Sequence, residues 1–338
     1  MRDVLGRNID YLRISVTDKC NLRCKYCMPP QGILPVAHEE ILTLEEIFRL
    51  VSIMEQLGIR KVRLTGGEPM VRKNLPWLVE QIHGLSGIRE IAMTTNGTLF
   101  APLAEVYRKA GLTAVNISLD TLDQERFRCI TGCDRGNHAA GVDSVLHAID
   151  AALERQLRVK INCVPCVEIN GEDIEGIAAL AEDRPVDVRF IELMPIGCGK
   201  NYTGICSEEI LRRLEQRYGK AIAIPEEVNM TNGPAEYYRF PGFCGRIGFI
   251  SPISHKFCNG CNRIRLTCEG RLKLCLHYDK GLELKPLLRG GVSDEEIRER
   301  ILAAVREKPS EHHFREKAAG GGLTDGAEEQ RKMVQIGG

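Results

Sequence analysis

The order of apolar and polar positions along the chain predicts alternating strands and helices. Short apolar runs predict strands at 11–17, 60–65, 90–95, 114–120, 158–164 and 186–193. Between them, apolar residues at helical spacing predict helices at 43–58, 74–85, 101–110, 139–156 and 172–183. In the first helix, Thr43 is the expected N-cap, Glu46 completes a capping box and Gly58 ends the helix.

Six strands separated by helices predict parallel pairing through right-handed crossovers. We therefore predict an α/β fold, an incomplete (β/α)6 barrel of the TIM type, two units short of a closed barrel. A doubly wound sheet is the rival architecture. No Gly-x-Gly-x-x-Gly follows the first strand, so the pattern disfavours a dinucleotide-binding fold.

The pattern changes after about residue 235. Short strands with tight turns are predicted at 243–253, 262–268 and 271–276, followed by an amphipathic helix at 293–308. We therefore predict a barrel domain at 1–235 and a smaller C-terminal α+β domain at 236–338. The last twenty residues are rich in glycine and polar side chains, and we expect a flexible tail there.

Composition limits the function classes. The formal net charge is zero, which argues against a nucleic-acid-binding surface. The N-terminus lacks the apolar region of a signal peptide, and no apolar run is long enough to span a membrane, so we expect a cytoplasmic protein with no membrane partner. In that compartment the 14 cysteines are expected to be reduced thiols or metal ligands.

Two groups of cysteines are dense. Cys20, Cys24 and Cys27 follow the first predicted strand with C-x3-C-x2-C spacing, which places them at the catalytic face of a parallel barrel. A structural zinc ion needs four ligands, whereas a 4Fe–4S cluster held by three cysteines leaves one iron open. Zinc with a distant fourth cysteine is the alternative interpretation.

The first group carries a family resemblance. C-x3-C-x2-C with Tyr26 before the last cysteine resembles the radical S-adenosylmethionine (SAM) superfamily, and "TGGEP" at 65–69 resembles its glycine-rich turn. The resemblance implies that the three cysteines bind a 4Fe–4S cluster and that its open iron binds SAM, which one electron cleaves to a deoxyadenosyl radical. We expect Gly66 and Gly67 to let the backbone approach the methionine amino group, and Glu68 to supply negative charge.

The second group lies near the C-terminus. Cys258, Cys261 and Cys275 have C-x2-C-x13-C spacing, with Cys268 between them. Four cysteines within such a short span also suit a zinc site. This segment resembles the GTP 3′,8-cyclase family of molybdenum cofactor biosynthesis, where C-x2-C-x13-C binds a second 4Fe–4S cluster that meets the guanine of GTP. Spacing alone leaves Cys268 open as a ligand in place of Cys275, and we predict Cys275.

The resemblance to that family covers nearly the whole chain, down to the Gly337-Gly338 end that reaches into the active site in the family. It implies SAM contacts at Tyr26, Gly67, Ser118 and Met194. It implies GTP contacts at Arg13, Arg63, Thr94, Lys160, Arg263, Ile264 and Arg265, with Lys61 and Arg189 as further phosphate or product contacts. It also implies a homodimer, and cyclic pyranopterin monophosphate synthase as the downstream enzyme.

Charge placement supports an anionic substrate independently. Arg13, Arg63, Lys160 and Arg189 each interrupt an apolar run in a predicted strand. Buried cations need an anionic partner, so one cation per strand facing a barrel interior would suit a triphosphate. Strand-edge positions or internal salt bridges are the alternative explanation.

The resemblance therefore predicts a radical SAM enzyme that cyclises GTP to 3′,8-cyclo-7,8-dihydro-GTP. Two other classes of protein are alternatives. A radical enzyme with an auxiliary cluster acting on a peptide has no use for the cations of the strands. The second alternative is a zinc-binding scaffold or regulator without catalytic activity.

Overall fold

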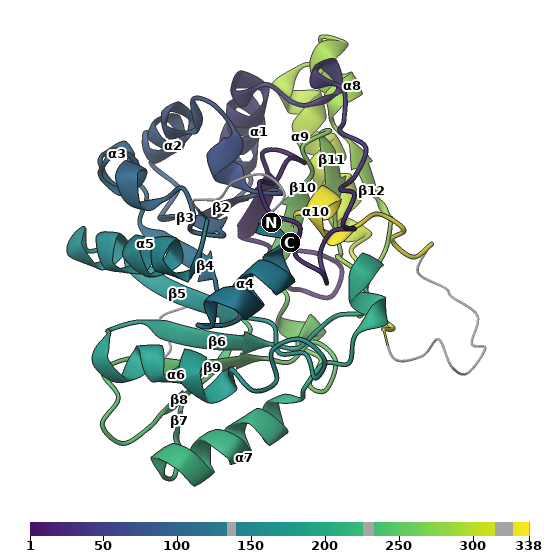
Figure 1. Ribbon diagram of the computed structural model, residues 1–338. Helices are drawn as coiled ribbons and strands as arrows, with labels where there is room; N and C mark the ends of the chain where they lie inside the picture. The colour runs from purple at the N-terminus through teal and green to yellow at the C-terminus, as the bar shows by residue number, and fades with distance from the viewer. Residues whose placement is uncertain (134–139, 226–232, 315–326, 338) are drawn as a thin grey trace.

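The computed structural model describes residues 1–133, 140–225, 233–314 and 327–337. Their strands form one sheet in the order β12-β11-β10-β1-β2-β3-β4-β5-β6-β9-β8-β7 (Figure 1). The strands are β1 (Tyr11–Ser15), β2 (Lys61–Thr65), β3 (Glu90–Thr95), β4 (Ala114–Ser118), β5 (Arg158–Cys163), β6 (Asp187–Ile191), β7 (Ile222–Ile224), β8 (Glu236–Arg239), β9 (Arg246–Ile250), β10 (Arg263–Leu266), β11 (Arg271–Lys273) and β12 (Gly281–Glu283).

The helices complete the βα units. They are α1 (Leu44–Gln56), α2 (Leu75–His83), α3 (Ala104–Ala110), α4 (Gln124–Thr131), α5 (Val142–Glu154), α6 (Ile174–Asp183), α7 (Ser207–Tyr218), α8 (Lys285–Arg289), α9 (Asp294–Arg306) and α10 (Met333–Ile336). Short 3₁₀ helices lie at His38–Glu40, Pro69–Val71, Ala101–Leu103, Gly197–Asn201 and Cys258–Gly260. Helices α1, α2, α3, α5 and α6 cover the outer face of the curved sheet (Figure 1).

The predicted barrel is confirmed. Strands β1 to β6 pair in chain order and in parallel, as right-handed βαβ units require. Successive strand residues point to opposite faces, so fully buried Leu12 and Ile14 face the helices while Arg13 faces the interior. This alternation places the apolar core between the sheet and the helices and leaves the inner face polar.

The first predicted helix also has the expected ends. The Thr43 side chain accepts a hydrogen bond from the Glu46 backbone at 3.1 Å, and the Glu46 carboxylate accepts one from the Thr43 backbone at 2.8 Å. This reciprocal capping box satisfies two backbone donors that a helix start otherwise leaves unpaired. Helices α4, α7 and α8 and strands β7, β8 and β12 were not predicted.

The C-terminal strands do not form a sheet of their own. β10 pairs in parallel with β1, and β9 pairs in parallel with β6, so both join the edges of the barrel sheet. The hairpin partners β11–β12 and β7–β8 then extend the sheet outward on each side. The division of the chain at 235/236 stays a prediction, while the shared sheet explains how C-terminal residues reach the barrel interior.

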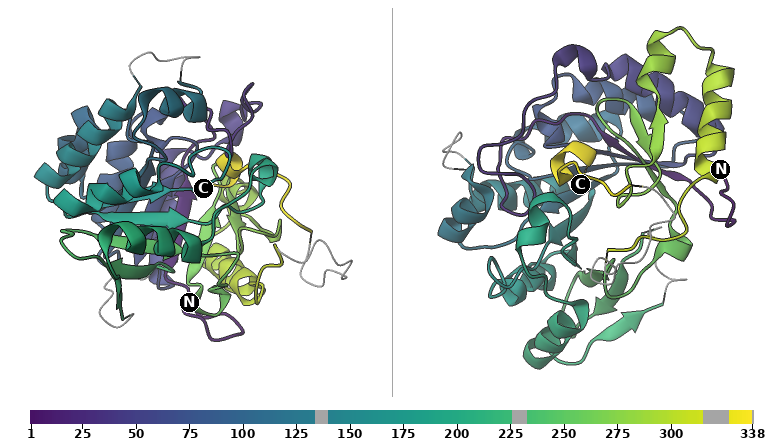
Figure 2. Two further views of the ribbon diagram at one scale, coloured as in Figure 1. Left: turned by 60° about the horizontal axis from the view of Figure 1, so that its bottom comes forward. Right: turned by 90° about the vertical axis from the view of Figure 1, so that its right-hand side faces the viewer.

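The expected flexible tail is wrong for residues 327–337. These residues fold back against the open side of the barrel, where they include α10 (Figures 1 and 2). Val334 and Ile336 are buried, so this segment is held by apolar packing that its glycine-rich surroundings concealed. Gly338 and residues 319–326 of the predicted tail lie outside the described residues. Among the helices that are described, none is both long and apolar enough to cross a bilayer.

Candidate functional site

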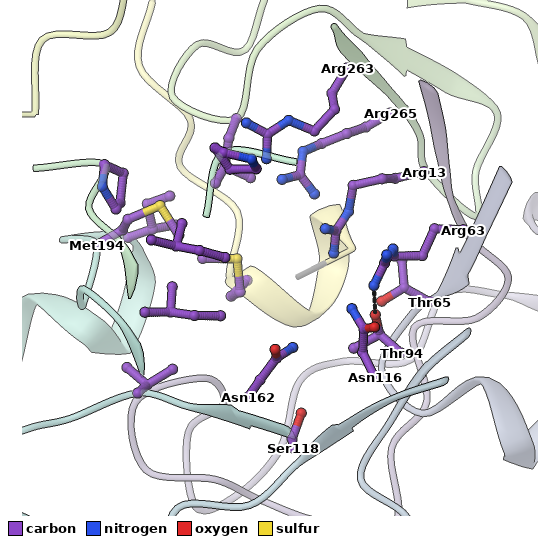
Figure 3. A pocket seen from close by; sticks show the side chains of 18 of the residues that line it. Arg13, Arg63, Thr65, Thr94, Asn116, Ser118, Asn162, Met194, Arg263 and Arg265 are labelled. Carbon is purple, nitrogen blue, oxygen red and sulfur yellow. Dashed lines mark hydrogen bonds between the residues drawn. The ribbon is translucent and has the colours of Figure 1, made fainter. Parts of the chain in front are cut away.

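The barrel interior contains a cavity of about 370 Å³. Its wall brings together cysteines of both dense groups and basic side chains from several strands. Figure 3 shows four of the basic side chains, Arg13, Arg63, Arg263 and Arg265. The predicted site residues that line it are Arg13, Cys20, Cys24, Tyr26, Cys27, Lys61, Arg63, Gly67, Thr94, Ser118, Lys160, Arg189, Met194, Cys258, Cys261, Arg263, Arg265 and Cys275. Ile264 does not line the cavity, because its buried side chain lies on the other face of β10 from Arg263 and Arg265.

The first cysteine loop gathers three thiols in a shielded place. Burial raises the pKa of Cys20 to about 11 and that of Cys27 to about 12. Burial, followed by repulsion from Cys27 and Cys20, also raises the pKa of Cys24. All three cysteines line the same cavity. As free thiols they stay protonated, and they become thiolate ligands only when a cationic group compensates them, as a 4Fe–4S cluster does.

The second cysteine group is set among cations. Electrostatic contacts link Cys258 to Cys275 and Cys261, and all three line the cavity. Burial alone raises the pKa of Cys261, but Lys308 and Arg263 outweigh it and lower that pKa to about 7. A partly ionised thiol at neutral pH is suited to metal binding.

Cys268 lies elsewhere. It is buried and absent from the cavity wall, and its electrostatic neighbours are Asp18 and Glu269 rather than the other cysteines. This position favours Cys275 over Cys268 as a ligand. Within the described part of the chain, no three His, Cys, Asp or Glu side chains converge closely enough for a single metal ion. A four-iron cluster binds each thiolate at a different iron, so its cysteines need not converge on one point.

The glycine-rich turn after β2 is required by packing on the cysteine loop. A Cβ on Gly66 would lie 2.5 Å from the Thr17 carbonyl oxygen, and one on Gly67 would lie 2.3 Å from the Lys19 carbonyl oxygen. The Gly67 N–H donates to the Thr17 carbonyl at 2.8 Å. The two turns therefore lock together through their backbones. The glycines were expected to let the backbone approach a ligand. The structure gives a further reason for them, which is close packing within the protein.

Glu68 of the same turn is buried and fully hydrogen bonded. Its carboxylate accepts hydrogen bonds from Thr95 Oγ1 at 2.8 Å and from the Asn96 and Met70 backbones at 2.7 and 3.0 Å. Burial raises the pKa of Glu68 to about 7 despite these bonds. The side chain thus ties the ends of β2 and β3 together beside the first cysteine loop.

We expect Gly67→Ala to destabilise the protein by about 1–3 kcal/mol, because the new methyl group overlaps the Lys19 backbone. Thermal unfolding measures the loss. Gly176→Ala is the matched control, because its Cβ would meet only Leu122 Cδ1 at 3.8 Å. Inside α6, that alanine is expected to stabilise the helix by up to about 1 kcal/mol. Equal unfolding temperatures for the two variants would contradict the close packing.

The interior cations form two rows across three neighbouring strands. In one row Arg265, Arg13 and Arg63 are register partners on β10, β1 and β2. In the next row Arg263 and Lys61 flank Tyr11. Figure 3 shows the four arginines along one wall of the cavity, opposite Ser118 and Asn162. Adjacent arginines repel one another, so this arrangement favours an anionic occupant.

Two interior arginines, Arg63 on β2 and Arg189 on β6, contact neutral groups. Arg63 donates to Tyr11 Oη and, at 3.4 Å, to Thr94 Oγ1. Arg189 donates twice to Asn162 Oδ1, at 3.0 and 2.5 Å. Within the described ranges, neither arginine forms an ion pair with a carboxylate. Their charges therefore remain available to a bound anion.

Lys61 and Lys160 differ from the arginines. Lys61 forms a salt bridge with Glu90 at 2.7 Å, so the alternative explanation, an internal salt bridge, holds for this residue. Burial, then repulsion from Arg189, lowers the pKa of Lys160 to about 6. Lys160 is therefore largely uncharged at neutral pH until an anion joins it.

Tyr26, which also lines the cavity, is held by its hydroxyl group. It donates to Asp120 Oδ2 at 2.6 Å, and Asp120 Oδ1 accepts from the Val164 backbone at 2.9 Å. Burial raises the pKa of Asp120 to about 6. These contacts hold the Tyr26 ring at the cavity wall.

Several residues of the cavity wall were not predicted: Tyr11, Asn116, Asn162, Glu192, His277, Lys308 and His312. A signal for three of them was present. Tyr11, Asn116 and Asn162 sit at even spacing from the predicted Arg13, Ser118 and Lys160 on the same strands, so period-two alternation puts them on the inner face. The others come from loops and carry no such pattern.

Two family profiles match the chain. The family profile described as the Radical SAM superfamily matches residues 14–181, and the profile described as Molybdenum Cofactor Synthesis C matches residues 186–314. Among solved structures, Streptococcus suis SuiB has a TM-score of 0.60 at 15% identity, covering 88% of this chain and 65% of SuiB. The same protein bound to its precursor peptide SuiA has a TM-score of 0.58 at 16% identity; this match covers 80% of this chain and spans 60% of SuiB. These likenesses concern the fold.

Curated relatives are much more similar in sequence. A GTP 3′,8-cyclase of Desulforamulus reducens is 47% identical, one of Syntrophomonas wolfei is 46% identical and one of Clostridium perfringens is 44% identical. Each alignment covers 100% of both chains. The chain therefore belongs to the GTP 3′,8-cyclase family of radical SAM enzymes.

Proposed function

We propose that this chain cyclises GTP to 3′,8-cyclo-7,8-dihydro-GTP, the first step of molybdenum cofactor biosynthesis. Cys20, Cys24 and Cys27 bind one 4Fe–4S cluster, and Cys258, Cys261 and Cys275 bind a second. When bound, the first cluster and SAM supply the one-electron chemistry that generates a deoxyadenosyl radical. Tyr26, Gly67, Ser118 and Met194 contact SAM.

The observation that carries this proposal is the single cavity shared by two cysteine groups and the arginine rows. The rows on β10, β1 and β2 bind the triphosphate of GTP, which orients the ribose and base between the two cysteine groups. Lysine and arginine outnumber glutamate in the wall, which suits a polyanion better than a peptide. Thr94 and Lys160 complete the contacts to GTP.

The chain's own residues have further roles in this proposal. The buried wall excludes water from reactive carbon atoms, and the paired turns around Gly67 hold the first cysteine loop in place. We place the enzyme in the cytoplasm as a homodimer. Cyclic pyranopterin monophosphate synthase takes the product onward.

Anaerobic purification and a single assay test the proposal. The protein is expected to be brown, with roughly eight irons per chain from two four-iron clusters. Incubation with SAM, a reductant and GTP is expected to yield deoxyadenosine together with a GTP-derived product. A colourless zinc protein would overturn the radical chemistry. Deoxyadenosine formed equally without GTP, and no GTP-derived product, would overturn the substrate.

The choice between Cys275 and Cys268 is tested by iron content. We expect Cys275→Ala to lose about half of the iron, because one four-iron cluster of two loses a ligand. Cys268→Ala is the matched control, and it is expected to keep all of the iron because Cys268 lies outside the cavity. Iron analysis of both purified variants shows which of the two cysteines is the ligand. The reverse pattern would make Cys268 the ligand.

Lys160 gives GTP binding a pH dependence. A bound triphosphate favours the charged amine, so its pKa rises from about 6 on binding and a proton is taken up. Affinity is therefore expected to fall as pH rises above about 6, by at most tenfold per pH unit. Calorimetry at pH 7.5 in two buffers of different ionisation enthalpy, without reductant, measures the uptake. Equal proton uptake by Lys160→Met would assign it to another group.

A further inference from the structure

Residues 327–337, here called the C-terminal strap, form part of the cavity wall. Met333 and Val334 line the cavity, and Figures 2 and 3 show the strap against the barrel interior. At its tip, Arg265 Nη1 donates to the Gly337 carbonyl oxygen at 2.5 Å. A Cβ on Gly337 would lie 3.2 Å from Ser15 Cβ and 3.3 Å from Thr65 Cγ2. The tip is thus packed on the ends of β1 and β2.

The root of the strap is held by a buried ion pair. Lys273 Nζ of β11 contacts the Glu329 carboxylate, and these side chains are only 0% and 2% exposed. Lys273 Nζ also donates to the Tyr278 carbonyl oxygen at 2.7 Å. On the other side, Arg331 Nε donates to Glu329 Oε1 at 2.9 Å. The Glu329 carboxylate therefore forms ion pairs with two cations, Lys273 and Arg331.

Backbone bonds fix the same segment to the chain around residue 278. The Glu329 N–H donates to the His277 carbonyl at 2.8 Å, and the Asp279 N–H donates to the Ala327 carbonyl at 2.8 Å. A buried ion pair contributes little net stability, because desolvation offsets the attraction. The ion pair acts here by fixing position, since it holds the start of the strap against β11 and so sets the direction of the strap.

Between root and tip, the strap reaches the first cysteine loop. Val334 and Cys27 line the same cavity, and the backbone N–H of Val334 interacts with the Cys27 sulfur. Lys332, two residues earlier, packs on the loop after β6, since a Cβ on Gly197 would lie 3.0 Å from Lys332 Cδ. An N–H directed at a ligand sulfur stabilises negative charge on a cluster, and a reduced cluster carries more of it.

We propose that Lys273 and Glu329 are positioning residues that dock the C-terminal strap, and that the docked strap raises the reduction potential of the cluster bound by Cys27. The proposal rests on the assignment of Cys27 as a cluster ligand under the proposed function. It adds that strap docking and electron acceptance are coupled. Undocking removes the Val334 N–H from Cys27 and makes the cluster harder to reduce.

The test measures potential rather than turnover. In Glu329→Gln and Lys273→Met, the midpoint potential of the first cluster is expected to fall, with the reduction equilibrium weakened up to about tenfold, or 59 mV for one electron. An EPR-monitored redox titration measures it, and the signal of the first cluster is identified by its change on SAM addition. Glu296→Gln, which breaks the exposed pair with Arg300, is the matched control and is expected to leave the potential unchanged.

A second pair of variants tests the contact without touching the ion pair. Val334→Pro removes the N–H, and proline is tolerated in the first turn of a helix such as α10. Val334→Ala shortens the side chain and keeps the N–H. We expect a lowered potential for the proline variant and an unchanged potential for the alanine variant. This pair still tests the proposal if Glu329→Gln and Lys273→Met fold poorly.

Hydrogen exchange of residues 327–337 measures whether the strap is docked or released. Faster exchange in Glu329→Gln together with a lowered potential supports the proposal. A strap that stays protected in that variant, or a potential that is unchanged after its release or in Val334→Pro, overturns it. A wild-type protein that binds no cluster at Cys27 contradicts the proposed function instead, and iron analysis shows this before any titration.

Discussion

Replacing Cys24 by alanine is expected to abolish deoxyadenosine formation and to remove about half of the iron, since one of two four-iron clusters loses a ligand. Cys24 is the middle cysteine of the first loop, and both Cys20 and Cys27 act electrostatically on its thiol. Removing one of three ligands leaves the cluster with two. Iron analysis and deoxyadenosine quantification under anaerobic conditions measure the two losses.

The matched control is Cys133→Ala. Cys133 is also a buried cysteine, but it lies in the apolar core and outside the cavity wall. We expect it to keep full iron content and activity, with a modest loss of stability of about 1 kcal/mol from the missing packing. A Cys24→Ala protein with full iron content would show that the first loop holds no cluster.

The barrel and its interior charges could be predicted because the signal is local. Arg13 lies between the helix-facing Leu12 and Ile14, and the same alternation on β2 exposes Arg63 to the interior. Parallel pairing of consecutive strands then places the two arginines in register. That both arginines face the barrel interior therefore follows from periodicity, whereas their register is seen only in the structure.

The role of the C-terminal strands could not be predicted in the same way. β10 pairs with β1 across roughly 250 residues of sequence, and nothing in a four-residue strand names its partner. This pairing adds Arg265 to the row of Arg13 and Arg63. The resemblance implied that the Arg263–Arg265 segment meets GTP, whereas the reason for its position is tertiary.

The strap shows a second limit of local patterns. Its sequence is polar and close to glycines, which predicts a flexible tail. Glu329 is nevertheless buried because Lys273, 56 residues earlier, provides its counter-charge. A buried charge depends on a partner that the surrounding sequence does not reveal. The folded strap was therefore visible only in three dimensions.

Replacing Arg13 by methionine is expected to weaken GTP binding by about 2–4 kcal/mol, which is roughly 30- to 1000-fold, because a buried charge-assisted contact to the triphosphate is lost. The same change is expected to stabilise the free protein. Burial and the neighbouring Arg265 hold the pKa of Arg13 well below its usual range. The folded state therefore disfavours its charge, and below the unfolded-state pKa that charge lowers the free energy of unfolding.

Opposite signs in two measurements distinguish a binding residue from a structural one. Calorimetric titration with GTP is expected to show the loss, while thermal unfolding without GTP shows a higher midpoint, since each 1 kcal/mol corresponds to a few degrees for a domain of this size class. Arg212→Met is the matched control, because Arg212 is exposed and pairs only with Glu209 among the described residues. It is expected to change neither quantity appreciably. An Arg13→Met protein that is less stable and binds GTP normally would assign Arg13 to the fold, and the anionic occupant of the arginine rows would then have to be sought elsewhere.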